Sequence, residues 1–217
     1  MKTDMELEKD VAEELKWDPS IDDSEIGISV RGGVVTLTGS VPDFAQKWGA
    51  LQAVERIAGV RAIAQELIVK LPDRYHVSDT ELAHQIVNTL LWDIEVPHEK
   101  IKVRVERGWV TLEGEVNWQF QRNSADRAVR HQKGVVGVSN LITIASHVSA
   151  HDIAQRVKDA LRRSAEADSK KISVSSDGGT VTLSGTVRSW AEREDAERAA
   201  WGTTGVTAVE DRLAISL

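Results

Sequence analysis

One six-residue pattern occurs three times in this chain, and it constrains the fold more than any other feature of the sequence. The pattern, Thr-Leu-x-Gly-x-Val, stands at residues 36–41, 111–116 and 182–187. The copies are offset by 75 and then by 71 residues, and the same offsets align the apolar positions around each copy without a gap. The difference in offset therefore lies in the linkers, residues 70–80 and 145–150. The pattern predicts three copies of one unit of about 65 residues.

Within each unit the spacing of apolar residues changes in a fixed order. Leu7, Val11 and Leu15 recur every four residues, which predicts a helix. Alternating apolar residues on both sides of the glycine turn at 32–33 predict a β-hairpin. A second helix with alanines on one face follows, ends at Gly59, and leads into a last short strand. We therefore expect an α+β fold of three tandem α-β-β-α-β units, each a three-stranded sheet with two helices on one face. The expected domains are residues 1–70, 78–145 and 149–217.

Composition excludes several classes of protein. The 217 residues include no cysteine, which excludes disulfides, thiolate metal sites, thiol catalysis and iron–sulfur clusters. A net charge of −7 argues against a dedicated nucleic-acid binder, since neutralising phosphates needs a basic surface. No stretch approaches the roughly 18 apolar residues that a membrane span needs. The first residues lack a secretory signal, so we expect a cytoplasmic protein as the chain is written, and a periplasmic one if a signal was removed.

The order of the predicted elements and the repeated motif resemble the bacterial BON domain, named after OsmY and nodulation proteins. The resemblance rests on the hairpin glycine, the x-Val-Thr-Leu-x-Gly-x-Val core, the later Gly-Val pair and the closing residues 138–142, in three consecutive copies. The chain is similar to the osmotically inducible, OsmY-like group, with three copies instead of two and without the signal peptide of periplasmic members. The resemblance implies binding to anionic phospholipid membranes. Resemblance to other members of the BON-domain family implies, as alternatives, chaperone-like action on envelope proteins, pore-associated roles or potassium sensing.

Gly39, Gly114 and Gly185 occupy the end of the second strand in each unit. The resemblance makes this glycine the hallmark position of the family, and a backbone that faces a ligand is one interpretation. We favour a structural role, because the end of a strand can require a positive φ or the close approach of another backbone segment.

Tryptophan dominates the aromatic residues, with seven Trp against one Tyr and two Phe. Trp17 and Trp92 share one repeat position near the end of the first helix. Such a residue can hold its ring at a membrane interface, or it can cover the small core half-buried. We favour the second interpretation. Trp48 and Trp201 lie off the alanine stripe of their helices, which predicts either exposure or burial between repeats.

The second unit carries the strongest candidate for an anion-binding surface. Lys100, Lys102 and Arg104 are predicted to alternate on the outward face of a strand, beside Trp109. The second helix of the same unit adds further basic residues. Each basic group near an anionic membrane contributes about 1 kcal/mol, whereas a solvated charged face is the alternative, because acidic residues lie among the basic ones. The candidate lipid-binding residues are Trp92, Lys100, Lys102, Arg104, Trp109, Trp118, Arg122, Arg127 and Arg130.

Other motifs indicate less chemistry. His147 and His151 are spaced for one helix face, but two ligands are fewer than the three that a zinc site needs. The Gly-Thr-Thr-Gly segment at residues 202–205 is interpreted as a helix stop and not as the phosphate-clamping loop of KH modules. No acid pair, Ser/His arrangement or phosphate loop recurs in the repeats, so we expect a protein without catalytic activity, cofactor or metal.

The sequence therefore predicts a non-enzymatic, stress-related binding protein that attaches to anionic phospholipid surfaces or to protein partners through the second unit. The alternative is a module without a lipid role, which senses potassium through backbone carbonyls or acts as an interaction or chaperone-like protein. Nucleic acid is not an expected partner, and the sequence leaves the oligomeric state open. The longer first linker predicts that the first unit moves more freely than the other two, and the short second linker predicts contact between units two and three.

Overall fold

The computed structural model describes residues 2–145, 153–163 and 171–215, and in it each predicted unit forms the expected α-β-β-α-β order. Repeat one comprises α1 (Asp4–Trp17), β1 (Ile26–Arg31), β2 (Val34–Val41), α2 (Phe44–Glu55) and β3 (Ala62–Val69). Repeat two comprises α3 (Asp79–Trp92), β4 (Ile101–Glu106), β5 (Trp109–Val116), α4 (Gln119–Arg130) and β6 (Gly137–Ile144). Repeat three comprises α5 (Ile153–Arg163), β7 (Ile172–Asp177), β8 (Thr180–Val187), α6 (Trp190–Trp201) and β9 (Ala208–Ile215). Short 3₁₀ turns cover Asp23–Glu25, Asp73–Tyr75 and His98–Lys100.

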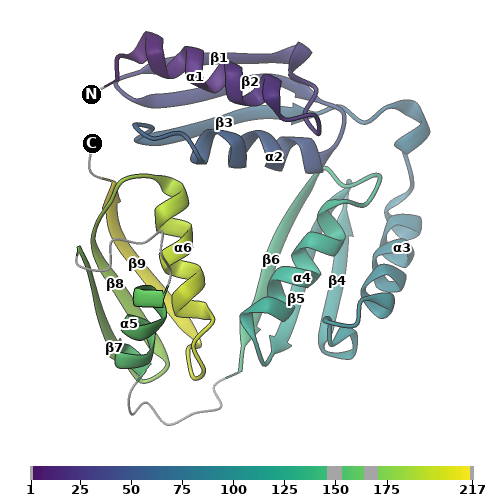
Figure 1. The fold of residues 1–217 in the computed structure, drawn as a ribbon. Helices are drawn as coiled ribbons and strands as arrows, with labels where there is room; N and C mark the ends of the chain where they lie inside the picture. Colours follow the sequence, from purple (N-terminus) through teal and green to yellow (C-terminus); the bar gives the residue numbers. More distant parts are fainter. Residues whose placement is uncertain (1, 146–152, 164–170, 216–217) are drawn as a thin grey trace.

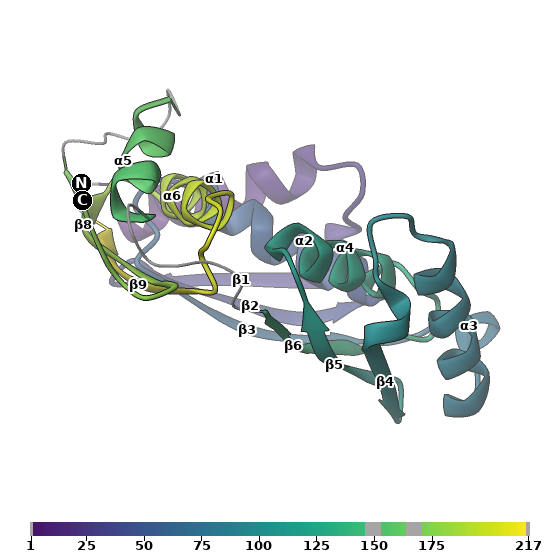
Figure 2. The ribbon, with the colours of Figure 1, turned by 90° about the horizontal axis from the view of Figure 1, so that it is seen from below.

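Each repeat contains one three-stranded sheet with its second strand in the middle. The hairpin strands pair antiparallel, and the last strand pairs parallel to the middle strand, with Val35 opposite Ile63 in repeat one. A parallel neighbour needs a crossover connection, and α2, α4 and α6 supply it. Both helices of a repeat lie on one face of its sheet, and the opposite faces of the three sheets lie on one side of the molecule (Figure 2). The predicted fold class is therefore confirmed.

The first helices of repeats one and two are held in place at their start by polar contacts, and all three first helices pack along their length against the core. In repeat two, Ser78 and Glu81 form a capping box, and the Asp79 carboxylate accepts hydrogen bonds from the hairpin N–H groups of Arg107 and Gly108, at 2.7 and 2.9 Å. Repeat one has the same contacts, made by Asp4. The predicted stripes are buried in the cores; they are Leu7, Val11 and Leu15, then Leu82, Ile86 and Leu90, then Ile153, Val157 and Leu161.

The three hallmark glycines lie where the middle strand meets the start of the hairpin. Gly39, Gly114 and Gly185 have φ values of +106°, +148° and +128°. A Cβ atom on Gly39 would overlap the carbonyl oxygen of Glu25, and the other two glycines meet the equivalent carbonyls of Lys100 and Lys171. Because only glycine combines this backbone conformation with this close approach, the position has a structural reason in every repeat.

The second helices of the three repeats converge on the middle of the molecule (Figure 1). Repeat three returns beside repeat one (Figures 1 and 2). The expectation of a freely moving first repeat is wrong, because Phe44 of repeat one packs against the core of repeat two and Trp190 of repeat three packs against the core of repeat one. Side-chain packing thus links repeat one to both of the others, whatever the length of its linker.

We expect Gly39→Ala to destabilise the protein by about 3 kcal/mol, since both a strained φ and a backbone overlap would have to be relieved. Gly32→Ala is the matched control, because Gly32 has a φ of +59° but no atom within 4 Å of the place that a Cβ would occupy. The control should cost about 1 kcal/mol, which is the strain of the left-handed backbone alone. Urea denaturation followed by circular dichroism measures both, and equal losses would contradict the close-approach explanation.

Candidate functional site

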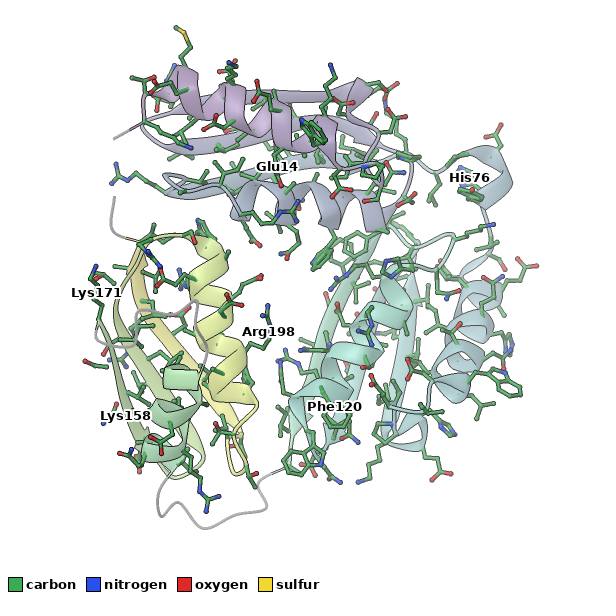
Figure 3. The ribbon with its side chains drawn as sticks, in the orientation of Figure 1. Glu14, His76, Phe120, Lys158, Lys171 and Arg198 are labelled. Carbon is green, nitrogen blue, oxygen red and sulfur yellow. The ribbon has the colours of Figure 1, made fainter. Side chains whose placement is uncertain are left out.

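A cavity of about 750 Å³ lies where α2, α4 and α6 converge. Its aromatic lining consists of Trp48, Trp118, Phe120 and Trp201, which come from all three repeats. The side chains of Phe120 from α4 and Arg198 from α6 belong to helices on either side of the cavity (Figure 3). A volume of this size is typical of small-molecule sites. Of the two alternatives predicted for Trp48 and Trp201, neither holds in full: Trp48 contacts Arg130 at the junction but is 36% exposed, and Trp201 is half-buried against the core of its own repeat while it lines the cavity.

The junction between repeats one and two combines a ring contact with an ion pair. The guanidinium carbon of Arg130 lies 3.7 Å from the centre of the Trp48 ring, and Asp126, one turn earlier on α4, forms an ion pair with Arg130. Burial lowers the pKa of Arg130, while Asp126 acts in the opposite direction. An arginine nevertheless stays charged at any ordinary pH, so Trp48 faces a permanent cation. Phe44 adds apolar contact with the core of repeat two.

The junction between repeats three and one brings carboxylates together. The Gln52 amide on α2 donates to Glu55 on the same helix and to Glu194 on α6, the latter at 3.3 Å. Burial, followed by the neighbouring Glu194, raises the pKa of Glu55 to about 7. Nearby on α6, burial and then a hydrogen bond with Asp211 raise the pKa of Glu197 to about 7. These carboxyl groups are therefore partly protonated near neutral pH.

The structure divides the candidate lipid-binding residues among three places. Trp92, Lys100, Lys102 and Arg104 lie at the free edge of repeat two, which we define as α3, residues 93–100 and the edge strand β4 (Figure 1). Lys100 and Lys102 are exposed, and Arg104 forms ion pairs with Glu106 and Glu113. Trp109 lies on the outer face of the sheet, where its indole N–H donates to Ser139 at 2.9 Å.

The remaining candidates belong to α4 and its N-cap. Trp118 and Arg127 line the central cavity, as does Arg130, and Arg127 forms an ion pair with Glu95 at 3.3 Å. Arg122 donates instead to the backbone carbonyl of Asn140. The structure therefore does not place the nine candidates on one surface, because Lys102 and Arg104 alternate with core-facing Val103 and so lie on the outer face of the sheet, whereas α4 covers the other face.

The packing interpretation of Trp17 and Trp92 is wrong. Their exposed fractions are 84% and 83%, so neither ring covers the core. Around Trp92 the structure exposes Val87, Leu91 and Ile94 as well. We call Val87, Leu91, Trp92 and Ile94 the α3 apolar patch. Sequence reasoning missed three of its members, although comparing the same position in each repeat would have revealed an apolar excess in the second.

Neither a metal-binding cluster nor a membrane-spanning helix is found in the described part of the chain. Within residues 2–145, 153–163 and 171–215, no group of three His, Asp or Glu side chains is arranged to hold a metal ion. In the same ranges no helix is both long and apolar enough to cross a membrane. His147 and His151 lie outside the described residues.

The repeated fold defines a protein made of three tandem α-β-β-α-β modules. The family model described as BON domain matches residues 3–70, 78–146 and 149–216. These matches cover most of the chain, so the chain belongs to the BON-domain family, and the resemblance seen in the sequence is confirmed.

The most informative relative is osmotically-inducible protein Y of Escherichia coli (strain K12), 30% identical over 125 residues. That match covers 56% of this chain and 62% of the relative, so the chain spans less than two thirds of the relative's length. Two solved structures of CdsD, a structural protein of the type III secretion system of Chlamydia trachomatis, are 15% identical with a TM-score of 0.27. They cover 96% and 100% of this chain, and 91% and 100% of their own chains. A TM-score of this size supports no inference about this chain.

The raised pKa values of Glu55 and Glu197 predict how the free energy of unfolding depends on pH. Glu55 and Glu197 have an ordinary pKa of 4.5, and burial raises each to about 7 in the folded protein. At a pH between these two pKa values, the carboxyl groups are ionised in the unfolded chain but still protonated in the folded protein. The free energy of unfolding therefore falls as the pH rises and levels off above about pH 7. We expect the melting temperature to fall between pH 5 and pH 8, and Glu55→Gln to reduce that fall.

The matched control is Glu66→Gln, which removes an exposed carboxylate from a sheet. Scanning calorimetry at several pH values should show the control following the unmodified protein. If Glu55→Gln also followed it, burial of Glu55 at the junction would be contradicted.

Proposed function

We propose that this protein is a peripheral membrane-binding protein that attaches to anionic phospholipid surfaces through the free edge of repeat two. The observation that carries the proposal is the α3 apolar patch. Trp92 is 83% exposed, Ile94 is fully exposed, and about half of Val87 and of Leu91 is exposed. An exposed group of this kind at the end of a helix suits insertion into the headgroup region, where a Trp ring has an apolar body and a polar N–H.

The patch is peculiar to repeat two. The positions of Val87, Leu91, Trp92 and Ile94 are occupied in repeat one by Ala12, Lys16, Trp17 and Pro19. In repeat three the first three of these positions are Lys158, Arg162 and Arg163. Since the repeats share one fold, this difference has no structural cause in the unit itself, which supports a specific role for the second copy.

Basic side chains at the same edge support an anionic surface as the target. Lys100 and Lys102 are exposed at the free edge of repeat two, and each would contribute about 1 kcal/mol near an anionic membrane. Arg104 contributes less, because Glu106 and Glu113 already balance its charge. Apolar insertion and basic attraction therefore act together, and the two lysines select anionic over neutral lipid.

The family and its osmotically inducible relative support a role in osmotic stress. We propose a binding role rather than catalysis, since the arginines that line the central cavity are engaged in ion pairs with acidic residues. Potassium sensing and binding to protein partners are the competing functions that the following experiment distinguishes.

Co-sedimentation with phosphatidylcholine vesicles, with and without phosphatidylglycerol, tests the proposal. We expect binding only to the vesicles that contain phosphatidylglycerol, and weaker binding at physiological than at low salt. The double variant Trp92→Ala and Ile94→Ala should reduce the bound fraction at least fivefold and leave the melting temperature unchanged, because both side chains are exposed.

Trp17→Ala is the matched control, since Trp17 has the same repeat position and exposure but lies outside the α3 apolar patch. It should bind as the unmodified protein does. Absence of binding to either vesicle would overturn the proposal, as would full binding by the double variant. A melting temperature that rises with potassium but not with sodium would then favour ion sensing.

A further inference from the structure

The two junctions described above use equivalent positions of the repeats. The repeat offsets align Trp48 with Asn123 and Glu194, and they align Glu55 with Arg130 and Trp201. Trp48 of repeat one contacts Arg130 of repeat two, and Glu194 of repeat three contacts Glu55 of repeat one. One rule therefore describes both junctions: the residue at the Trp48 position meets the residue at the Glu55 position of another repeat.

The same rule would pair Asn123 of repeat two with Trp201 of repeat three, and at this place the structure has the central cavity. Both residues line it, on α4 and α6 respectively. Phe44 and Trp190 start α2 and α6 and insert into neighbouring cores, whereas the equivalent residue on α4 is Gln119. The Gln119 amide donates to Asn123 on its own helix at 3.1 Å. Gln119 thus replaces the aromatic residue, and the junction between repeats two and three stays open.

The charges at the open junction favour a cation. Its three arginines are each balanced by an acid, in the pairs Arg127 with Glu95, Arg130 with Asp126, and Arg198 with Asp195. By contrast, Glu194 and Glu197 line the cavity and form no ion pair with any lysine or arginine in the described ranges of the chain. Arg193 lies close enough to Glu197 to favour its ionised form, but Arg193 forms its ion pair with Asp211. Carboxylates that lack an ion-pair partner of their own in a partly buried site are stabilised by an added positive charge.

The aromatic lining indicates which kind of cation fits. At the closed junction the ring of Trp48 already receives the guanidinium of Arg130 at 3.7 Å. At the open junction Trp201 occupies the position equivalent to Arg130, faces the cavity, and has Trp118 and Phe120 on the opposite helix. Aromatic walls with nearby carboxylates recognise alkylated ammonium groups through cation–π contact. A bare metal ion fits less well, since no group of three metal-binding side chains exists among the described residues.

We propose that the open junction between α4 and α6 binds an organic ammonium cation, with its alkyl groups against Trp118 and Trp201 and its charge balanced by Glu194 and Glu197. The ligand takes the place that the guanidinium of Arg130 fills at the junction of repeats one and two. A cavity of about 750 Å³ has room for a cation of this class together with water. No residue of the α3 apolar patch lines the cavity, so the site does not depend on the proposed lipid binding.

Isothermal titration calorimetry with tetramethylammonium chloride tests the proposal. The titration is done at pH 8, where Glu197, with a pKa of about 7, is mostly ionised. We expect saturable binding of tetramethylammonium and none of sodium at the same ionic strength. Trp118→Ala and Glu194→Gln should each weaken the affinity at least tenfold.

Trp17→Ala is the matched control, because it removes an exposed tryptophan outside the cavity and should leave the affinity unchanged. Thermal melts establish that the variants fold. If Glu194→Gln disturbs the junction with repeat one, the affinity of Trp118→Ala decides the outcome, because the Trp118 side chain is 45% exposed and its removal should leave the fold intact. Absence of saturable tetramethylammonium binding would overturn the proposal. Unchanged affinity in Trp118→Ala would also overturn it, as would tighter binding of benzoate, which would make the cavity an anion site.

Discussion

The arrangement of the whole molecule depends on aromatic side chains at the start of the second helices. Phe44 inserts beside the core of repeat two, and Trp190 inserts beside the core of repeat one. A unit of about 65 residues buries too little apolar surface to be strongly stable alone, so these shared contacts add to the stability of each repeat. They also set the three second helices against one another. Both the polar junctions and the central cavity follow from that convergence.

Sequence differences among the repeats produce both the α3 apolar patch and the open junction between α4 and α6. The fold positions are the same in each copy, yet the end of the first helix is apolar only in repeat two, and the start of the second helix is polar only there. The first difference exposes the α3 apolar patch at the outer edge of repeat two. The second leaves the junction between α4 and α6 open. Repeat two thus carries the α3 apolar patch and one wall of the central cavity, and no residue of the patch belongs to the cavity lining.

The charged residues at the two closed junctions are partly buried, and their neighbours determine how each charge is stabilised. Arg130 keeps a partner in Asp126 and a ring beneath it, so its charge is compensated. Glu55 and Glu194 share the amide of Gln52 and contact each other, and burial together with Glu194 raises the pKa of Glu55 to about 7. Arg130 and Glu55 differ in this way because they occupy equivalent positions of repeats two and one, one with a basic and the other with an acidic side chain. Sequence reasoning identified Trp118, Arg127 and Arg130 as functional candidates but assigned them to the same surface as Lys102, because helix periodicity does not show which face another repeat will cover.

The sequence by itself determined the three units, the order of their elements, the hairpin turns and the glycine at the end of each middle strand. These features follow from local periodicity and backbone conformation, which act within a few residues. Tertiary structure alone decided that Trp17 and Trp92 are exposed, that repeat one packs against both other repeats, and that Trp48 and Glu55 meet residues far away in the chain. The physical reason is that docking between repeats depends on side-chain packing and charge across surfaces whose mutual orientation no local pattern encodes.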